Sequence, residues 1–235
     1  MAAPAEAAPT GAIFDPTGFY LALDTSGTAG SVALSAGPDV LARATLDEQG
    51  RHASRLVPAV AEVMEEAGVD RHELSGLVVG EGPGSFTGVR VAAATAKGLA
   101  AGLKIPLWAV SSLAAGALNL DGAGVRYVLF DARGDRIYGA CYEVGVAGLE
   151  TVRPPHGGTL KEVVFGDVPT AAVFMGDGAV RHRRALEGAG HTVADAPAGV
   201  PTGDALVRFL TLQPGAPPVA DPGAWEPRYV REWSR

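Results

Sequence analysis

The chain has 235 residues, of which 47% are hydrophobic, and its 19 Lys and Arg against 26 Asp and Glu give a formal net charge of −7. This length suits one large domain or two small ones, and no apolar run approaches the roughly 18 residues of a bilayer span, so we expect no membrane contact. The acidic balance also disfavours an independent nucleic-acid binder, because counterion release from a polyanion needs clustered cations.

The start of the chain and its cysteine content bear on the compartment. Residues 1–18 are rich in Ala and Pro and lack the basic start and apolar block of a secretory signal, so we expect a disordered leader. Cys141 is the single cysteine and forms no intramolecular disulfide, which is typical of a reducing compartment. These features predict a cytoplasmic protein.

Hydrophobic runs between turn signals define the first half of the chain. Strands are predicted at 19–24, 31–37, 40–46, 76–80 and 107–110. Helices are predicted at 52–67, closed by Gly68, and at 85–101, with Ser85 as the N-cap and Gly102 at the end. The order of elements is β-β-β-α-β-α.

The second half begins in the same way. Strands are predicted at 126–131 and 136–144, and weaker signals follow for a helix at 160–165, a strand at 171–176 and helices at 178–190 and 205–213. Two related halves resemble the layout of the actin-like ATPase (ribonuclease H-like) superfamily. We therefore predict an α/β fold of two lobes, each of β-β-β-α-β-α type, with an N-terminal lobe at 19–110 and a C-terminal lobe at 111–235.

An aspartate ends the first strand of each half, and a glycine follows three positions later. The pairs are Asp24 with Gly27 and Asp131 with Gly134. In the actin-like superfamily such hairpins face each other across a cleft, where turn N–H groups hold phosphate and carboxylates position a metal. The alternative is that both aspartates only stabilise tight turns. The four residues are therefore candidates for a nucleotide site, intact or vestigial.

The stretch GEGPGSFTGVR at 80–90 is glycine-rich but matches no phosphate-binding motif. A P-loop needs a lysine that is missing here, and a dinucleotide-binding fingerprint needs a different glycine spacing. Pro83 and Gly84 predict a turn, and Ser85 predicts a helix start behind it. Free N–H groups at that start remain an alternative anion site.

Residue patterns typical of metal or nucleophilic catalysis are missing from the sequence. The five histidines show no ligand spacing, and with one cysteine they form no zinc set. No GxSxG anchor supports a serine nucleophile. We expect neither a catalytic residue nor a metal site.

The helices predicted at 52–67 and 85–101 carry more apolar surface than one sheet face needs. Such a surplus indicates either a protein partner or a core covered by the second half of the chain. Sequence alone does not decide which stripe faces the core. The candidate partner-binding residues are His52, Leu56, Val60, Val63, Met64, Ser85, Val89, Ala92, Ala93 and Ala96.

Four stretches resemble the TsaB family, formerly described as non-catalytic glycoprotease-like proteins. They are LALDTSGTAGSVAL, RHASRLVPAV, GEGPGSFTGVRVAAATAKGLA and LFDARGDRIYGACY, and the closing EPRYVREW is also similar. The resemblance implies an actin-like fold and a degenerate relationship to TsaD. It also implies binding to TsaD through the two N-terminal helices, and a homodimer through the same surface when TsaD is absent.

The resemblance further implies a role in transferring threonylcarbamoyl to adenosine 37 of tRNAs that read ANN codons. TsaD carries out this transfer together with the ATPase TsaE, so TsaE and tRNA would be indirect partners. TsaD has a metal-binding His-x-x-x-His where this chain has Ser112 and Gly116. We therefore expect a non-catalytic partner subunit without its own cofactor, although ATP or ADP shared at the interface with TsaD stays open. The alternatives are an active ATPase or phosphotransferase and, less supported, a metallopeptidase.

Overall fold

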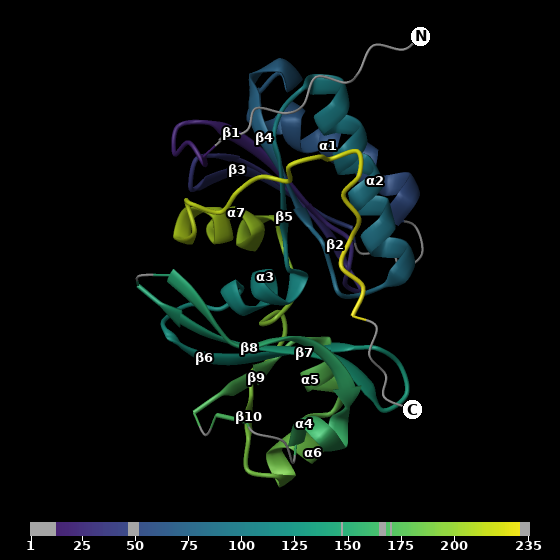
Figure 1. Ribbon diagram of the computed structural model, residues 1–235, viewed down its shortest axis with the longest axis vertical. Helices are drawn as coiled ribbons and strands as arrows, with labels where there is room; N and C mark the ends of the chain where they lie inside the picture. The colour runs from purple at the N-terminus through teal and green to yellow at the C-terminus, as the bar shows by residue number, and fades with distance from the viewer. Residues whose placement is uncertain (1–12, 47–51, 147, 165–167, 170, 231–235) are drawn as a thin grey trace.

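A computed structural model describes residues 13–46, 52–146, 148–164, 168–169 and 171–230. Two five-stranded sheets form two lobes, with strand orders β3-β2-β1-β4-β5 and β10-β9-β6-β7-β8. The lobes are stacked along the long axis of the molecule (Figure 1). No helix within the described ranges is long and apolar enough to cross a membrane.

The first lobe follows the predicted order. Its elements are β1 (Phe19–Asp24), β2 (Gly30–Ala36), β3 (Asp39–Leu46), α1 (His52–Ala67), β4 (Leu74–Gly80), α2 (Phe86–Leu103) and β5 (Leu107–Val110), with a 3-10 turn at Arg71–Glu73. Ser85 is the N-cap of α2, as predicted, whereas the helix continues past Gly102 to Leu103 and is capped by Lys104 in a left-handed conformation. Gly68, at φ +66°, closes α1 as predicted.

The second lobe repeats the first. Its elements are β6 (Gly124–Asp131), β7 (Arg136–Gly145), β8 (Gly148–Thr159), α4 (Leu160–Val164), β9 (Val173–Met175), α5 (Asp177–Arg181), α6 (Arg183–Gly188) and β10 (Thr192–Val193). The order β8-β7-β6-β9-β10 corresponds strand for strand to β3-β2-β1-β4-β5, which confirms the predicted repeat. β8 was not predicted; it is an edge strand that contains Pro154 and Pro155, as edge strands tolerate.

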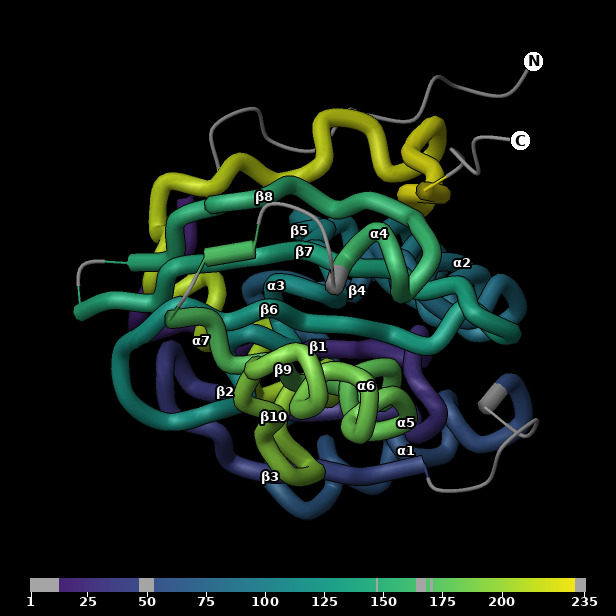
Figure 2. Tube along the Cα trace, turned by 90° about the horizontal axis from the view of Figure 1, so that it is seen from below, coloured from purple at the N-terminus to yellow at the C-terminus, as the bar shows by residue number. Residues whose placement is uncertain are grey.

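The last part of the chain returns to the first lobe. α1 and α2 cover one face of the first sheet, α7 (Gly203–Leu212) packs on the opposite face, and α3 (Ser112–Leu118) lies between the lobes (Figure 1). The helices α4, α5 and α6 cover the far face of the second sheet, which Figure 2 shows from below. α7 and the residues after it, which lie inside the predicted C-terminal lobe at 111–235, therefore pack on the first sheet.

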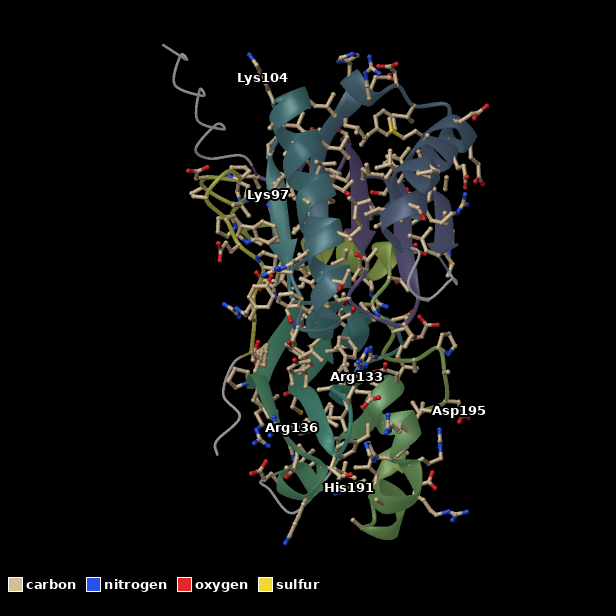
Figure 3. The ribbon with its side chains drawn as sticks, turned by 90° about the vertical axis from the view of Figure 1, so that its right-hand side faces the viewer. Lys97, Lys104, Arg133, Arg136, His191 and Asp195 are labelled. Atoms are coloured by element: carbon tan, nitrogen blue, oxygen red, sulfur yellow. The ribbon has the colours of Figure 1, made fainter. Side chains whose placement is uncertain are left out.

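Residues 213–229, called here the C-terminal strap, run along the outer side of β5 and α2. The backbone N–H of Val219 donates to the Leu107 carbonyl at 2.7 Å, and that of Arg228 donates to the Glu81 carbonyl at 3.0 Å. Trp108 Nε1 donates to the Ala216 carbonyl at 3.0 Å. Figure 3 shows α2 between the strap and α1. The strap thus covers a sheet edge that would otherwise be open to pairing.

The predicted leader at 1–18 is wrong for its last six residues, and residues 1–12 lie outside the described ranges. Phe14 is buried, and its ring lies 4.7 Å from the ring of Tyr20. The Asp15 N–H donates to Tyr20 Oη at 2.7 Å, and Thr17 bonds to the Asp15 carboxylate. Apolar burial and these bonds fix the segment against β1.

Candidate functional site

The turn after β1 holds a buried carboxylate that the chain itself satisfies. Asp24 is fully buried, and its Oδ1 accepts from the N–H and the hydroxyl of Ser26, both at 2.7 Å. Its Oδ2 accepts from Ser112 Oγ at 2.7 Å. Such charge-assisted bonds stabilise a carboxylate away from water. Asp24 therefore ties the end of β1 to the start of α3.

The GEGPGSFTGVR stretch packs on this same turn. The Ser85 N–H donates to the Ser26 carbonyl at 2.8 Å, and Thr25 Oγ1 donates to the Gly88 carbonyl at 2.6 Å. A Cβ at Gly88 would lie 1.8 Å from the Thr25 carbonyl oxygen, so only glycine fits. The glycines of this stretch thus serve close backbone packing, as the prediction of a turn that aims a helix implied.

The corresponding turn of the second lobe is more open. Asp131 Oδ1 accepts from the Arg133 N–H at 3.0 Å, just as Asp24 Oδ1 accepts from the N–H two residues on, and Gly134 follows at φ +66°. Asp131 also forms an ion pair with Arg181, and its N–H donates to Asp177 at 3.1 Å. Burial raises the pKa of Asp177, which backbone N–H bonds oppose.

The residues at the two turns fit a metal-bound nucleotide poorly. Both oxygens of Asp24 already accept from Ser26 and Ser112, and the Asp131 carboxylate is neutralised by Arg181. A ligand would have to displace these bonds or compete with the arginine. A Cβ added at Gly27 would lie 3.7 Å from the ring of Pro201, so this turn packs against the loop before α7. The structure therefore gives the two predicted aspartates, Asp24 and Asp131, partners within the chain.

Ser112 and Gly116, the two positions compared with the metal ligands of TsaD, are both buried. Besides binding Asp24, Ser112 Oγ accepts from the Gly82 N–H at 3.1 Å. A Cβ at Gly116 would lie 2.5 Å from the Gly199 carbonyl oxygen, so a histidine is excluded there. In the described part of the chain no three His, Cys, Asp or Glu side chains gather as metal ligands would.

Most of the predicted partner-binding stripe faces the core. Leu56, Val60, Val63, Ala92 and Ala96 belong to the cluster between α1, α2 and the first sheet, with Met64 packed against it. Val89 and Ala93 are 2% and 3% exposed. The choice of stripe is therefore corrected, because a side chain packed beneath a helix is not available to a partner. Ser85 is exposed as the helix cap, and the side chain of His52 lies outside the described residues.

The opposite sides of the two helices remain exposed and carry small or apolar residues. Val57 is 60% exposed on α1, and Phe86 is 55% exposed at the start of α2. We call these exposed sides the α1/α2 face. Its residues are Val57, Pro58 and Ala61 on α1 and Phe86, Thr87, Arg90, Ala94, Gly98 and Ala101 on α2. Small side chains would let another helix approach closely.

Sequence reasoning missed the side chains that the strap brings to α2. Arg90 Nε donates to Tyr229 Oη at 2.9 Å, and Lys97 Nζ donates to the Trp225 carbonyl at 2.8 Å. These contacts join residues more than a hundred positions apart. The closing EPRYVREW was noted only for its resemblance, and no spacing rule could place it beside α2.

The chain is similar in sequence to proteins of threonylcarbamoyladenosine biosynthesis. Residues 40–163 match the family model of TsaD, tRNA N6-adenosine threonylcarbamoyltransferase. The tRNA threonylcarbamoyladenosine biosynthesis protein TsaB of Bacillus subtilis is 33% identical over 172 residues, which cover 71% of this chain and 74% of that protein. The TsaB of Escherichia coli is 38% identical over 132 residues, covering 55% and 57%.

Solved structures agree with the sequence matches. YeaZ from Pseudomonas aeruginosa superposes with a TM-score of 0.75 at 29% identity, covering 91% of this chain and 100% of that one. The ethanolamine utilization protein EutJ from Carboxydothermus hydrogenoformans shares the fold alone, with a TM-score of 0.52 at 13% identity over 85% of this chain and 92% of that one. The expected two-lobed actin-like fold is thereby confirmed.

Proposed function

Because the chain belongs to the TsaB family, we propose that it acts in tRNA threonylcarbamoyladenosine biosynthesis as a non-catalytic partner subunit of a TsaD-type transferase. The observation that carries the partner role is the α1/α2 face. Two neighbouring helices expose Val57 and Phe86 beside small residues such as Ala94. Apolar patches of this kind on a soluble surface mark protein interfaces.

The proposed absence of catalysis is supported by the chemistry of the turns. Asp24 is used by the fold, and Ser112, for which the resemblance to TsaD implied a metal-ligand position, donates to Asp24. A hydroxyl that already binds a carboxylate is a poor replacement for an imidazole. The subunit would therefore act by binding TsaD, while TsaD supplies the transfer chemistry.

The wider assembly follows as part of the same proposal. The α1/α2 face would form a homodimer when TsaD is absent, TsaE would join through the TsaB–TsaD pair, and tRNA contact would come mainly from TsaD because this chain has a net charge of −7. A nucleotide, if one takes part, would be bound weakly or shared at that junction. The cytoplasm is the compartment that this role requires.

Reconstitution tests the proposal. Purified TsaD, TsaE, the threonylcarbamoyl-adenylate donor and an ANN-reading tRNA are incubated with and without this protein, and modified adenosine is measured. We expect modification to depend on its addition. An undiminished rate without it contradicts the role. Calorimetry with Mg-ATP on the isolated chain tests the alternative function of an active ATPase or phosphotransferase. Micromolar affinity with turnover would favour that alternative over the non-catalytic role.

A further inference from the structure

Arg90 lies on the α1/α2 face and is held in place from both sides. Its guanidinium carbon lies 3.8 Å from the centroid of the Phe86 ring, one turn earlier on α2, and 5.6 Å from that of Tyr229. Nε donates to Tyr229 Oη at 2.9 Å, and the two rings lie 5.6 Å apart. An exposed arginine normally samples many rotamers, and these contacts remove much of that freedom.

The strap carries Tyr229 to this position. The neighbouring Arg228 is fixed by its backbone N–H bond to Glu81 and by an ion pair with the Glu81 carboxylate at 3.7 Å. Further back, Lys97 Nζ binds the Trp225 carbonyl. The strap is thus attached to α2 and to the preceding loop on both sides of Arg90. Tyr229 is positioned by the fold, although it is far from α2 in the sequence.

The terminal guanidinium nitrogens of Arg90 are hydrogen-bond donors that could bind a partner group. Nε is the only nitrogen of its guanidinium that bonds to a residue in the described ranges, so among those residues the four N–H donors of Nη1 and Nη2 have no acceptor. A planar fork with a fixed stem is suited to bidentate binding of an oxyanion, above all a carboxylate. Preorganisation makes such binding stronger because little side-chain entropy is lost.

We propose that Arg90 is a receptor for an acidic side chain of the protein that covers the α1/α2 face, and that Tyr229 of the strap and Phe86 position it. This rests on the proposed function, in which that protein is TsaD. Continuity favours a protein carboxylate over a nucleic-acid phosphate, since Ala94 and Gly98 continue the exposed side of α2 beyond Arg90. The exposed Glu62, Glu65 and Glu66 on α1 would repel a polyanion.

The experiment measures the affinity of the full chain for TsaD encoded in the same genome, by calorimetry. Arg90→Ala should weaken binding at least about tenfold, and Arg90→Lys nearly as much, because lysine keeps the charge but loses the fork. Tyr229→Phe, which removes one hydroxyl, should weaken it about threefold. Added to Arg90→Ala, that change should cost nothing more, because Tyr229 acts through Arg90. Arg184→Ala, an exposed arginine of α6, serves as the matched control and should bind like wild type.

Melting temperatures within about two degrees of wild type confirm that each variant is folded. Wild-type affinity of Arg90→Ala for TsaD overturns this inference and leaves the proposed function standing. No binding by the wild-type chain overturns both. Fluorescence anisotropy with labelled tRNA tests the alternative ligand. If Arg90→Ala weakens tRNA binding but not TsaD binding, Arg90 binds phosphate and the carboxylate assignment is overturned.

Discussion

Ser112 donates a 2.7 Å hydrogen bond to Asp24, and neither side chain is exposed to water. The same hydroxyl oxygen accepts from the Gly82 N–H at 3.1 Å. One serine therefore joins the end of β1, the loop before α2 and the start of α3. In this chain Ser112 therefore serves the junction of the two lobes.

Replacing this serine should weaken the fold. Ser112→Ala removes a partner from the buried Asp24 carboxylate and from the Gly82 N–H, which we expect to cost about 2–3 kcal/mol of unfolding free energy. Ser111→Ala is the matched control, because Ser111 Oγ makes only a 3.5 Å contact with Tyr142 Oη. Urea denaturation measures both. Equal midpoints for the two variants would contradict the role of Ser112.

Neighbouring alanines on α2 distinguish the core from the partner face. Ala94 is exposed, so Ala94→Arg should leave the fold intact and abolish copurification with TsaD. Ala93 is 3% exposed, so Ala93→Arg should bury a charge and lower stability by roughly 3 kcal/mol or more. Thermal melting and pull-down are measured on both. Retention of TsaD by a folded Ala94→Arg variant would show that the partner binds elsewhere.

Two glycines in α2 should respond oppositely to alanine. A Cβ at Gly88 would lie 1.8 Å from the Thr25 carbonyl oxygen, whereas one at Gly98 meets nothing within 4 Å. Gly88→Ala should therefore separate α2 from the Asp24 turn and destabilise the protein. Gly98→Ala should stabilise it by up to about 1 kcal/mol, because alanine favours the helix. Unfolding midpoints in urea measure both effects. If Gly88→Ala stabilised the protein, the close approach of Gly88 to the Thr25 carbonyl would be contradicted.

A partly buried histidine in the second lobe depends on staying neutral. His156 Nδ1 contacts the Pro154 carbonyl at 3.0 Å, which can only accept, so Nδ1 carries the proton. Nε2 then accepts from Tyr127 Oη at 3.1 Å, and that oxygen accepts from Arg153 at 2.9 Å. Burial lowers the pKa of His156, and the positive charge of Arg153 lowers it further.

Acid should therefore weaken the second lobe. A pKa lower in the folded than in the unfolded chain means that unfolding takes up a proton. The contribution of His156 is complete above its ordinary pKa of 6.5, and it decreases as the pH falls from there through the lowered folded pKa. We expect His156→Gln, which keeps an acceptor without titrating, to lose less stability than wild type between pH 7.5 and 5. Urea titrations at both pH values measure the free energy of unfolding. Equal losses of stability in wild type and His156→Gln would show that His156 does not cause the acid sensitivity.

Strands with continuous apolar runs were predictable, as β1 and β5 show, because burial on both faces leaves a clear pattern. The repeat was predictable for a related reason, since the turns at Asp24 and Asp131 use the same side-chain bond to the N–H two residues on. β8 was missed because its sequence, GLETVRPPHGGT, is polar and contains two prolines.

The candidate surface was only partly predictable. α1 and α2 were identified as helices with surplus apolar surface, but the stripe chosen for the partner faces the core. Alanine occurs on every side of α2, buried at Ala92 and Ala96 and exposed at Ala94 and Ala101. The hydrophobic pattern therefore does not indicate which side of this helix faces the core. The contact between Arg90 and Tyr229 depends on where the strap runs, which only the assembled tertiary structure determines.

The return of the chain to its first lobe affects how the protein is made. β1, β2 and β4 are covered on one side by α7, and the edge strand β5 is covered by the strap, both from the last 35 or so residues of the chain. A ribosome that has finished only the first half has released a sheet with one bare apolar face. The N-terminal lobe therefore reaches its native packing only after α7 and the strap have been synthesised, and a fragment ending at residue 110 should aggregate during expression.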